Sequence, residues 1–226
     1  MTPPGRRAGR GRGPRRRGPR PLPQLAIDFA PEAPPWRYSR LVQRSPHRER
    51  IHERLQFVRA FFPELEGVTV RVGLARKPGV LGWGSLDPEA PGVWVRPRRL
   101  DAFTIAHELT HLLQARGLVP RGERACDLWA LARSPLVVDA PPGYLRIPAE
   151  LRRQRVLSPR DAACLHRTAR RALEARACGE RGYLKYFERE LEAAMRDPAA
   201  KPDPRRAREA TPESFPLTAP RGPARA

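Results

Sequence analysis

The chain is organised around ten residues near its middle, Thr104-Ile105-Ala106-His107-Glu108-Leu109-Thr110-His111-Leu112-Leu113. The apolar residues recur at steps of three and four, as on one face of an α-helix. Asp101 and Gly117 flank this pattern and are residue types typical of a helix start and a helix end. We therefore expect a helix from Ala102 to about Arg116. Glu108 is its only acidic or basic residue before the last turn, which indicates a buried helix.

The spacing of His107 and His111 predicts a metal site. Two residues four apart on a helix share one face, so both imidazoles can reach a single ion. Glu108 lies about 100° further round the helix, beside the ion, where a general base for hydrolysis must stand. The alternative is a buried helix with two structural histidines.

A zinc ion bound in this way needs a third protein ligand and keeps one position open for water. Glu123 and Asp127 are four apart in a second expected helix, Gly122–Arg133, and so share a face. Glu123 is the candidate ligand, and Asp127 is placed to accept the second N–H of a ligating histidine. The alternative is that both are solvated acidic residues at a helix start, where the helix dipole stabilises negative charge.

Three other residues are alternatives to Glu123 as the third metal ligand. They are Asp139, His166 and Glu180. Cys126 could compete as a soft zinc ligand, but it points about 60° away from the Glu123/Asp127 face of a regular helix and is interpreted as a small buried apolar residue.

These residues resemble the gluzincin metallopeptidases, which pair an HExxH helix with a second helix carrying Glu-x-x-x-Asp. The chain is also similar to the compact SprT-like and ImmA/IrrE-like groups, in which a small sheet precedes the metal helix. The resemblance spans about residues 65–135. It implies one Zn²⁺ held by His107, His111 and Glu123, and hydrolysis of a protein or peptide substrate with Glu108 as base. Only eleven residues separate His111 from Glu123, which implies a tight helical hairpin.

Further residues are candidates for handling a substrate. Peptide hydrolysis needs a donor that stabilises the oxyanion, and Tyr144, Arg146 and His166 remain open for this role. The segment Val93-Trp94-Val95 is a candidate sheet edge on which an extended substrate could add a strand. The alternative is a core strand in which Trp94 simply packs.

The remaining pattern predicts an α+β fold. Short alternating or apolar runs at 68–74, 80–84 and 93–95 suggest a small antiparallel meander, and helices are expected at 47–62, about 158–177 and 181–196. The expected metallopeptidase domain is 25–196, beginning with an extended arm over residues 25–46. Residues 1–24 and 197–226 are rich in Arg and Pro and are expected to be disordered basic tails.

Charge and cysteine content narrow the class of protein. The formal net charge is +20, with eight Arg in the first twenty residues, so the basic tail is a possible weak nucleic-acid contact. A true nucleic-acid-binding tail would interleave aromatic residues, and residues 1–24 contain none. Three cysteines form no disulfide framework, and no apolar run resembles a signal or membrane span, so a cytoplasmic protein without a membrane contact is expected.

Another alternative to the peptidase is a non-catalytic zincin-like module that binds zinc and mediates contacts with other proteins. Glu108 argues against it, because metal binding alone does not require that residue.

Overall fold

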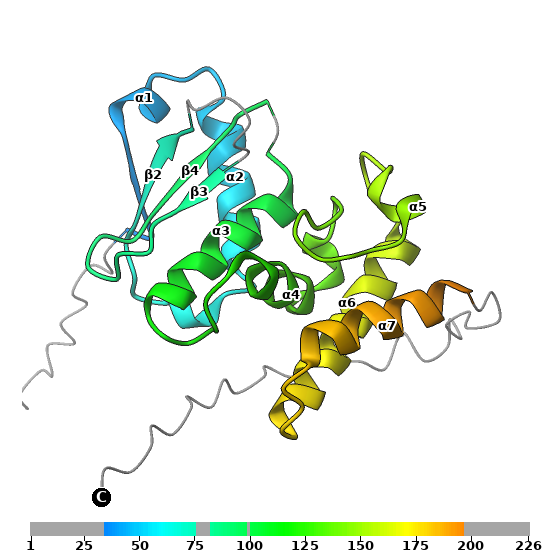
Figure 1. Ribbon diagram of the computed structural model, residues 1–226. Coiled ribbons are helices and arrows are strands. Elements are labelled where there is room, and N and C mark those ends of the chain that lie inside the picture. The colour runs from blue at the N-terminus through cyan, green and yellow to red at the C-terminus, as the bar shows by residue number, and fades with distance from the viewer. Residues whose placement is uncertain (1–33, 76–81, 99, 197–226) are drawn as a thin grey trace, which may run out of the picture. The chain divides into compact units, whose positions relative to one another are not determined.

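A four-stranded sheet and the helices packed on it form the described part of the chain (Figure 1). This computed structural model describes residues 34–75, 82–98 and 100–196. The expected tails, 1–24 and 197–226, and the first part of the expected arm lie outside these residues. The prediction of an α+β fold is confirmed.

The sheet is mixed. Its strands are β1 (Trp36–Tyr38), β2 (Val70–Leu74), β3 (Gly82–Gly84) and β4 (Gly92–Val95), in the order β1-β2-β4-β3. β2 pairs in parallel with β1 and β4, and only β3 and β4 are antiparallel. The predicted antiparallel meander is therefore wrong, because the chain passes from β2 to the outer position of β3 before it returns to β4. Strand β1 was also missed, since the segment was interpreted as an extended arm.

The helices follow the predicted pattern closely. Five expected helices are present as α2 (Arg48–Arg59), α3 (Ala102–Ala115), α4 (Glu123–Arg133), α6 (Pro159–Ala177) and α7 (Tyr183–Arg196). Two four-residue helices were not expected, α1 (Arg40–Gln43) and α5 (Ala149–Arg152), and short 3₁₀ turns cover Pro63–Leu65 and Pro135–Val137. Such short helices carry too little periodicity to be recognised in sequence. None of the described helices is long and apolar enough to cross a membrane.

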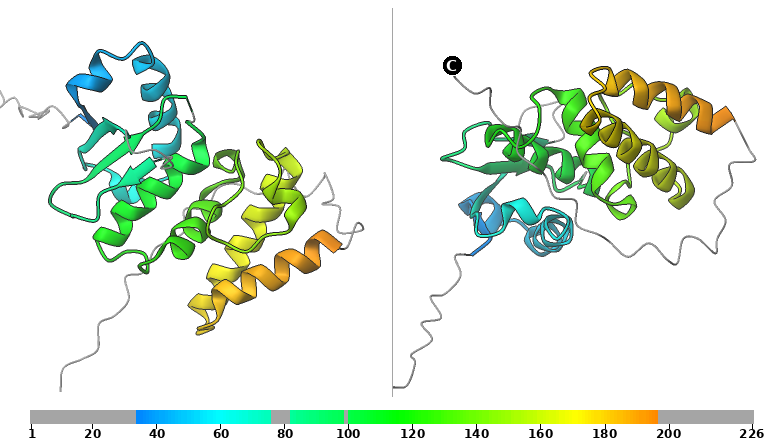
Figure 2. Two further views of the ribbon diagram at one scale, coloured as in Figure 1. Left: turned by 45° about the horizontal axis from the view of Figure 1, so that its top comes forward. Right: turned by 90° about the horizontal axis from the view of Figure 1, so that it is seen from below.

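Helix α3 lies at the centre of the core. Twelve of its fourteen residues are buried, as expected from its lack of charge. The inward-facing valines of β2 and β4 and the apolar side of α2 enclose it on one side, and α4 packs along the other. Helices α6 and α7 then cover α4 (Figures 1 and 2). This arrangement places α3 and α4 next to each other as the predicted helical hairpin.

The start of α3 is held by a distant carboxylate. Asp101 occupies the N-cap position, but the backbone N–H groups of Ala102 and Phe103 donate to Asp139, at 2.8 and 3.0 Å. Both Asp139 oxygens are thus engaged at the helix start, more than a turn from His107. Asp139 is therefore a helix cap in this fold, and its candidacy as a metal ligand fails.

Candidate metal centre

Helices α3 and α4 bring together the side chains expected at a metal site. His107 and His111 lie one turn apart on α3 with ring centroids 4.9 Å apart, and they are 7% and 9% exposed. Glu123, the first residue of α4, directs one oxygen between them. That Oε2 atom lies 3.0 Å from Nε2 of His107 and 3.3 Å from Nε2 of His111. Three potential ligand atoms therefore face one another.

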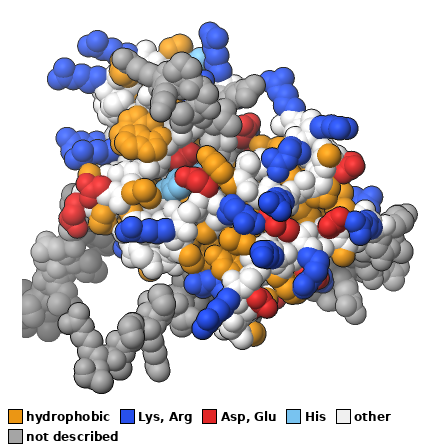
Figure 3. Space-filling model, in the orientation of Figure 1, with side chains coloured by type: hydrophobic (Ala, Val, Ile, Leu, Met, Phe, Trp, Pro, Cys, Tyr) orange, Lys and Arg blue, Asp and Glu red, His pale blue; other side chains and the backbone are white. Residues whose placement is uncertain are grey.

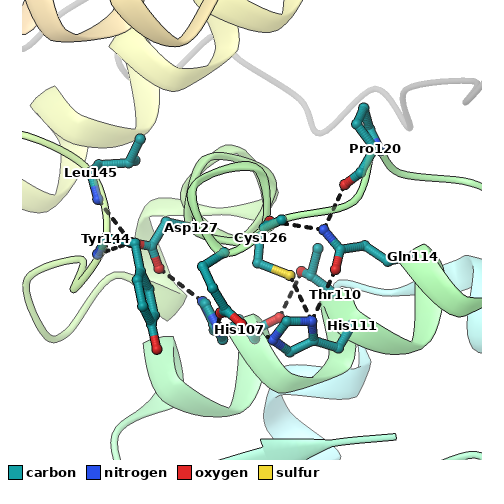
Figure 4. Close-up of polar contacts among 12 residues, drawn as sticks. His107, Thr110, His111, Gln114, Pro120, Cys126, Asp127, Tyr144 and Leu145 are labelled. Carbon is teal, nitrogen blue, oxygen red and sulfur yellow. Dashed lines mark hydrogen bonds and ion pairs between the residues drawn. The ribbon is translucent and has the colours of Figure 1, made fainter. Parts of the chain in front are cut away.

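Asp127 selects the free nitrogen of His107. Its Oδ1 atom lies 2.8 Å from Nδ1 of His107, and an ionised carboxylate only accepts, so Nδ1 carries the proton. Nε2 is then the nitrogen that faces Glu123, and it offers a lone pair to a metal ion when the ring is neutral. The other Asp127 oxygen accepts the backbone N–H groups of Tyr144 and Leu145, at 2.6 and 3.2 Å (Figure 4). Asp127 thus fixes both the imidazole and the loop beside it.

Gln114 performs the same task for His111. Its Nε2 donates to the carbonyl oxygens of Pro120 and Gly122, at 2.6 and 3.0 Å. Its Oε1 must then face Nδ1 of His111, 2.9 Å away, and that nitrogen must be the donor (Figure 4). Gln114 was not predicted as part of the site, although it follows His111 by three residues and therefore lies on the same face of the helix.

The surroundings raise the pKa of His107 and lower the pKa of His111. Burial lowers the pKa of His107, but the hydrogen bond and the charge of Asp127, together with the charges of Glu108 and Glu123, outweigh burial, so the pKa lies above its ordinary value. For His111, burial and the positive charge of His107 lower the pKa. Neutral His111 is accordingly the form that offers its lone pair most readily.

Glu108 lies beside these histidines and is 6% exposed. Burial raises its pKa to about 7, while the charge of His107 and a hydrogen bond from the backbone of Gly84 act in the opposite direction. A carboxyl group whose pKa lies near neutrality can both accept and return a proton.

Strand β3 passes directly over this part of α3. A Cβ atom added to Gly82 would lie 2.7 Å from Oε1 of Glu108, and one added to Gly84 would lie 2.6 Å from the Glu108 carbonyl oxygen. Only glycine permits such an approach at both positions. β3 is also an edge strand, whereas β4 is enclosed between β2 and β3. The prediction that Val93-Trp94-Val95 forms the free edge is therefore wrong.

Cys126 lies closer to the histidines than expected. It is fully buried on α4, and its Sγ atom is 3.2 Å from Nδ1 of His111. His107, His111 and Cys126 lie close enough to bind one metal ion, with ligand atoms within 4.8 Å of one another. The expected burial of Cys126 is confirmed, but the packing of α4 on α3 also brings its thiol beside His111, which the sequence pattern did not predict.

The remaining candidates divide into one neighbour of the site and several distant groups. The ring of Tyr144 stacks on His107, with centroids 5.6 Å apart and planes at 19°. His166 instead directs Nδ1 to the carbonyl oxygen of Leu131, 2.9 Å away and about 12 Å along α4 from Glu123. The other residues contact groups outside the site: the backbone N–H of Arg146 donates to Glu188, Glu180 accepts from Gly182, and Trp94 contacts Trp83.

Comparisons of the chain with family models, with curated proteins and with solved structures gave no match.

Proposed function

We propose that the protein is a zinc-dependent metallopeptidase with its active centre between α3 and α4. The observation that carries this proposal is the approach of Glu123 Oε2 to both histidine Nε2 atoms, with Glu108 beside them. Two imidazoles and one carboxylate, with one position left for water, are a ligand set typical of catalytic zinc. Asp127 and Gln114 contact Nδ1 of His107 and of His111, so Nε2 of each histidine is left for the metal.

Two ligand sets are compatible with the donors present, and the hydrogen bonds favour Glu123. Cys126 approaches Nδ1 of His111, the nitrogen that Gln114 already holds in its protonated form. A metal bound by Cys126 and that nitrogen would have to displace the Gln114 contact. Burial also raises the pKa of the Cys126 thiol, which disfavours the thiolate that a metal requires. We therefore assign Glu123 as third ligand and Cys126 as a buried neighbour.

When bound, the zinc ion polarises the scissile carbonyl group and makes water a stronger nucleophile at neutral pH. Glu108 accepts the proton of the attacking water and returns it to the leaving amine, in keeping with its near-neutral pKa. The positive charge of the ion would lower that pKa and favour the carboxylate before attack.

The peptide substrate is proposed to extend along strand β3, the edge strand over Glu108. Unpaired backbone groups of an edge strand can pair with an extended peptide whatever its side chains are. Tyr144, stacked on His107 and 55% exposed, is the candidate donor to the oxyanion. His166 and Arg146 have no part in this proposal.

The decisive experiment measures metal content and peptide hydrolysis in the same preparations. Wild type should contain about one zinc per chain by mass spectrometry and should cleave an unstructured protein such as casein. Glu108→Gln should retain the metal and lose hydrolysis, whereas His107→Ala and Glu123→Ala should lose the metal. Cys126→Ser is the matched control and should retain both.

Three outcomes would contradict this assignment. Wild type that takes up no zinc would leave α3 a structural helix. Hydrolysis that persists in Glu108→Gln would remove the peptidase mechanism. Zinc that is lost in Cys126→Ser but kept in Glu123→Ala would transfer the third-ligand role to the thiol.

A further inference from the structure

The sheet has a second face whose side chains do not enter the core. Along β2 and β4 the valines at alternate positions are buried toward the helices, and the residues between them point the opposite way. Strand pairing places Arg37 opposite Arg71, and Trp83 opposite Trp94. These four residues define what we call the outer face.

The two tryptophans of the outer face form a supported aromatic surface. A Cβ atom at Gly73 would lie 2.3 Å from the Trp94 ring, and one at Gly92 would lie 2.9 Å from it, so this ring lies across the backbones of β2 and β4. Trp83 packs on Trp94 with ring centroids 4.4 Å apart and planes at 35°. Trp83 is nevertheless 57% exposed, which leaves a large aromatic surface in water without a partner from the core.

The two arginines of the outer face give it positive charge. Arg37 and Arg71 are exposed and directly opposite each other on β1 and β2. Within the ranges that the structure describes, neither guanidinium forms an ion pair with a carboxylate. Like charges placed opposite each other repel, and an anion between them would relieve the repulsion. Lys and Arg side chains also cover more of the surface visible in Figure 3 than Asp and Glu side chains do, and the chain carries a formal net charge of +20.

We propose that the outer face binds single-stranded nucleic acid, with a base stacked on Trp83 and backbone phosphates paired with Arg37 and Arg71. Every base offers a flat π surface to an exposed aromatic ring, and a guanidinium matches a phosphate in both charge and geometry. Four strands at the usual spacing extend over about 14 Å, and a four-stranded sheet that carries exposed aromatic residues can stack two or three bases. The aromatic residues that the basic N-terminal segment lacks are thus present on the folded sheet. This proposal does not depend on the metallopeptidase assignment, because the side chains of the outer face point away from α3, although Trp83 belongs to β3, the strand assigned to the peptide substrate.

The test compares full-length variants for binding to a fluorescent oligo(dT) by anisotropy. Trp83→Ala should weaken binding about five-fold or more, and Trp83→Phe should retain most of the affinity because a ring is kept. Arg71→Ala should reduce the slope of log affinity against log salt by about 0.7, the value for one phosphate contact on a single strand. Arg153→Ala removes the same charge from an exposed position on another element and is the matched control for Arg71.

The basic N-terminal segment is identical in all these proteins, so differences between variants report on the outer face alone. Equal affinity of wild type, Trp83→Ala and Arg71→Ala would overturn the proposal, as would a failure of wild type to bind oligo(dT). Competition by dextran sulfate, which has no bases, as strong as competition by unlabelled oligo(dT) would also overturn it. If Trp83→Ala weakened co-sedimentation with phosphatidylglycerol vesicles but not oligo(dT) binding, the surface would be a membrane contact instead.

Discussion

At the scale of single residues, the candidate centre depends on which nitrogen of each histidine is free. Asp127 and Gln114 each engage an Nδ1 atom and leave Nε2 of His107 and His111 for the metal. Neither partner is a proposed ligand. Partners of this kind fix the orientation of metal-binding imidazoles and increase their affinity for the ion.

Substitution of Asp127 tests this orienting role. Asp127→Asn replaces one oxygen with an NH₂ group, which must face either His107 or the N–H groups of Tyr144 and Leu145. We expect zinc affinity to fall about 10- to 100-fold, as measured by competition with a chromophoric chelator. Asp87→Asn, in an exposed turn, is the control and should bind as wild type does. Unchanged affinity in Asp127→Asn would mean that the contact does not support the ligand.

His166 should make stability depend on pH. Burial lowers its pKa below the ordinary value of 6.5, so near that pH the unfolded chain binds more protons than the folded one. Neutral His166 therefore contributes fully to the stability of the fold above about pH 6.5, the pKa in the unfolded chain. This contribution is lost as the pH falls from there through the lower pKa of the folded chain. We expect the melting temperature of His166→Asn to decline less than that of wild type between about pH 7 and pH 5. The exposed His47→Asn is the control, and identical slopes for wild type and His166→Asn would refute the expectation.

At the scale of elements, the close contact between β3 and α3 shapes the centre. Gly82 and Gly84 allow the strand to lie against Glu108, and Gly84 donates a backbone hydrogen bond to its carboxylate. The strand that contacts the proposed general base is also the edge to which we assign the substrate. Small changes in this contact should therefore affect packing and the proposed chemistry together.

A single methyl group at Gly84 tests the contact. The new Cβ would lie 2.6 Å from the carbonyl oxygen of Glu108 and 2.8 Å from Cβ of His111, so strand or helix must shift. We expect Gly84→Ala to lower the free energy of unfolding by about 1–3 kcal/mol in urea titrations. Gly143→Ala is the control, because nothing lies within 4 Å of the added Cβ. If the two variants were equally stable, β3 would not be packed as tightly as the structure indicates.

At the scale of the whole molecule, the proposed ligands come from two helices that belong to different parts of the core. Helix α3 packs against the sheet, and α4 packs against the C-terminal helices α6 and α7 (Figure 1). A metal ion shared by these two helices would link the two parts of the core. An ion that binds only the folded chain also stabilises it by mass action.

Zinc should therefore raise the melting temperature. At a free concentration 100 times the dissociation constant, binding to the folded state adds about 2.7 kcal/mol, which for a chain of this size corresponds to roughly 5–10 °C. We expect this shift between chelator-treated and zinc-loaded wild type by calorimetry. Glu108→Gln should show the same shift and His111→Ala should not. An equal shift in His111→Ala would indicate binding elsewhere in the chain.

The amino-acid sequence by itself was sufficient to predict the α+β class, five helices and the shared faces of His107/His111 and Glu123/Asp127. These features depend on helical periodicity over a few turns, which is local information. The approach of Glu123 to both histidines depends in addition on the packing of α4 on α3. The roles of Glu108 as base and of Glu123 as zinc ligand stay predictions.

The pairing of the strands, and therefore the identity of the edge strand, could be seen only in the tertiary structure. Short β segments of similar pattern do not reveal their partners, so β4 was taken for the edge that β3 occupies. The same limit hid the contacts between residues far apart in sequence: Asp139 at the start of α3, Cys126 beside His111, and Trp83 on Trp94. Each of these contacts depends on the packing of one element against another, and no local pattern in the chain specifies it.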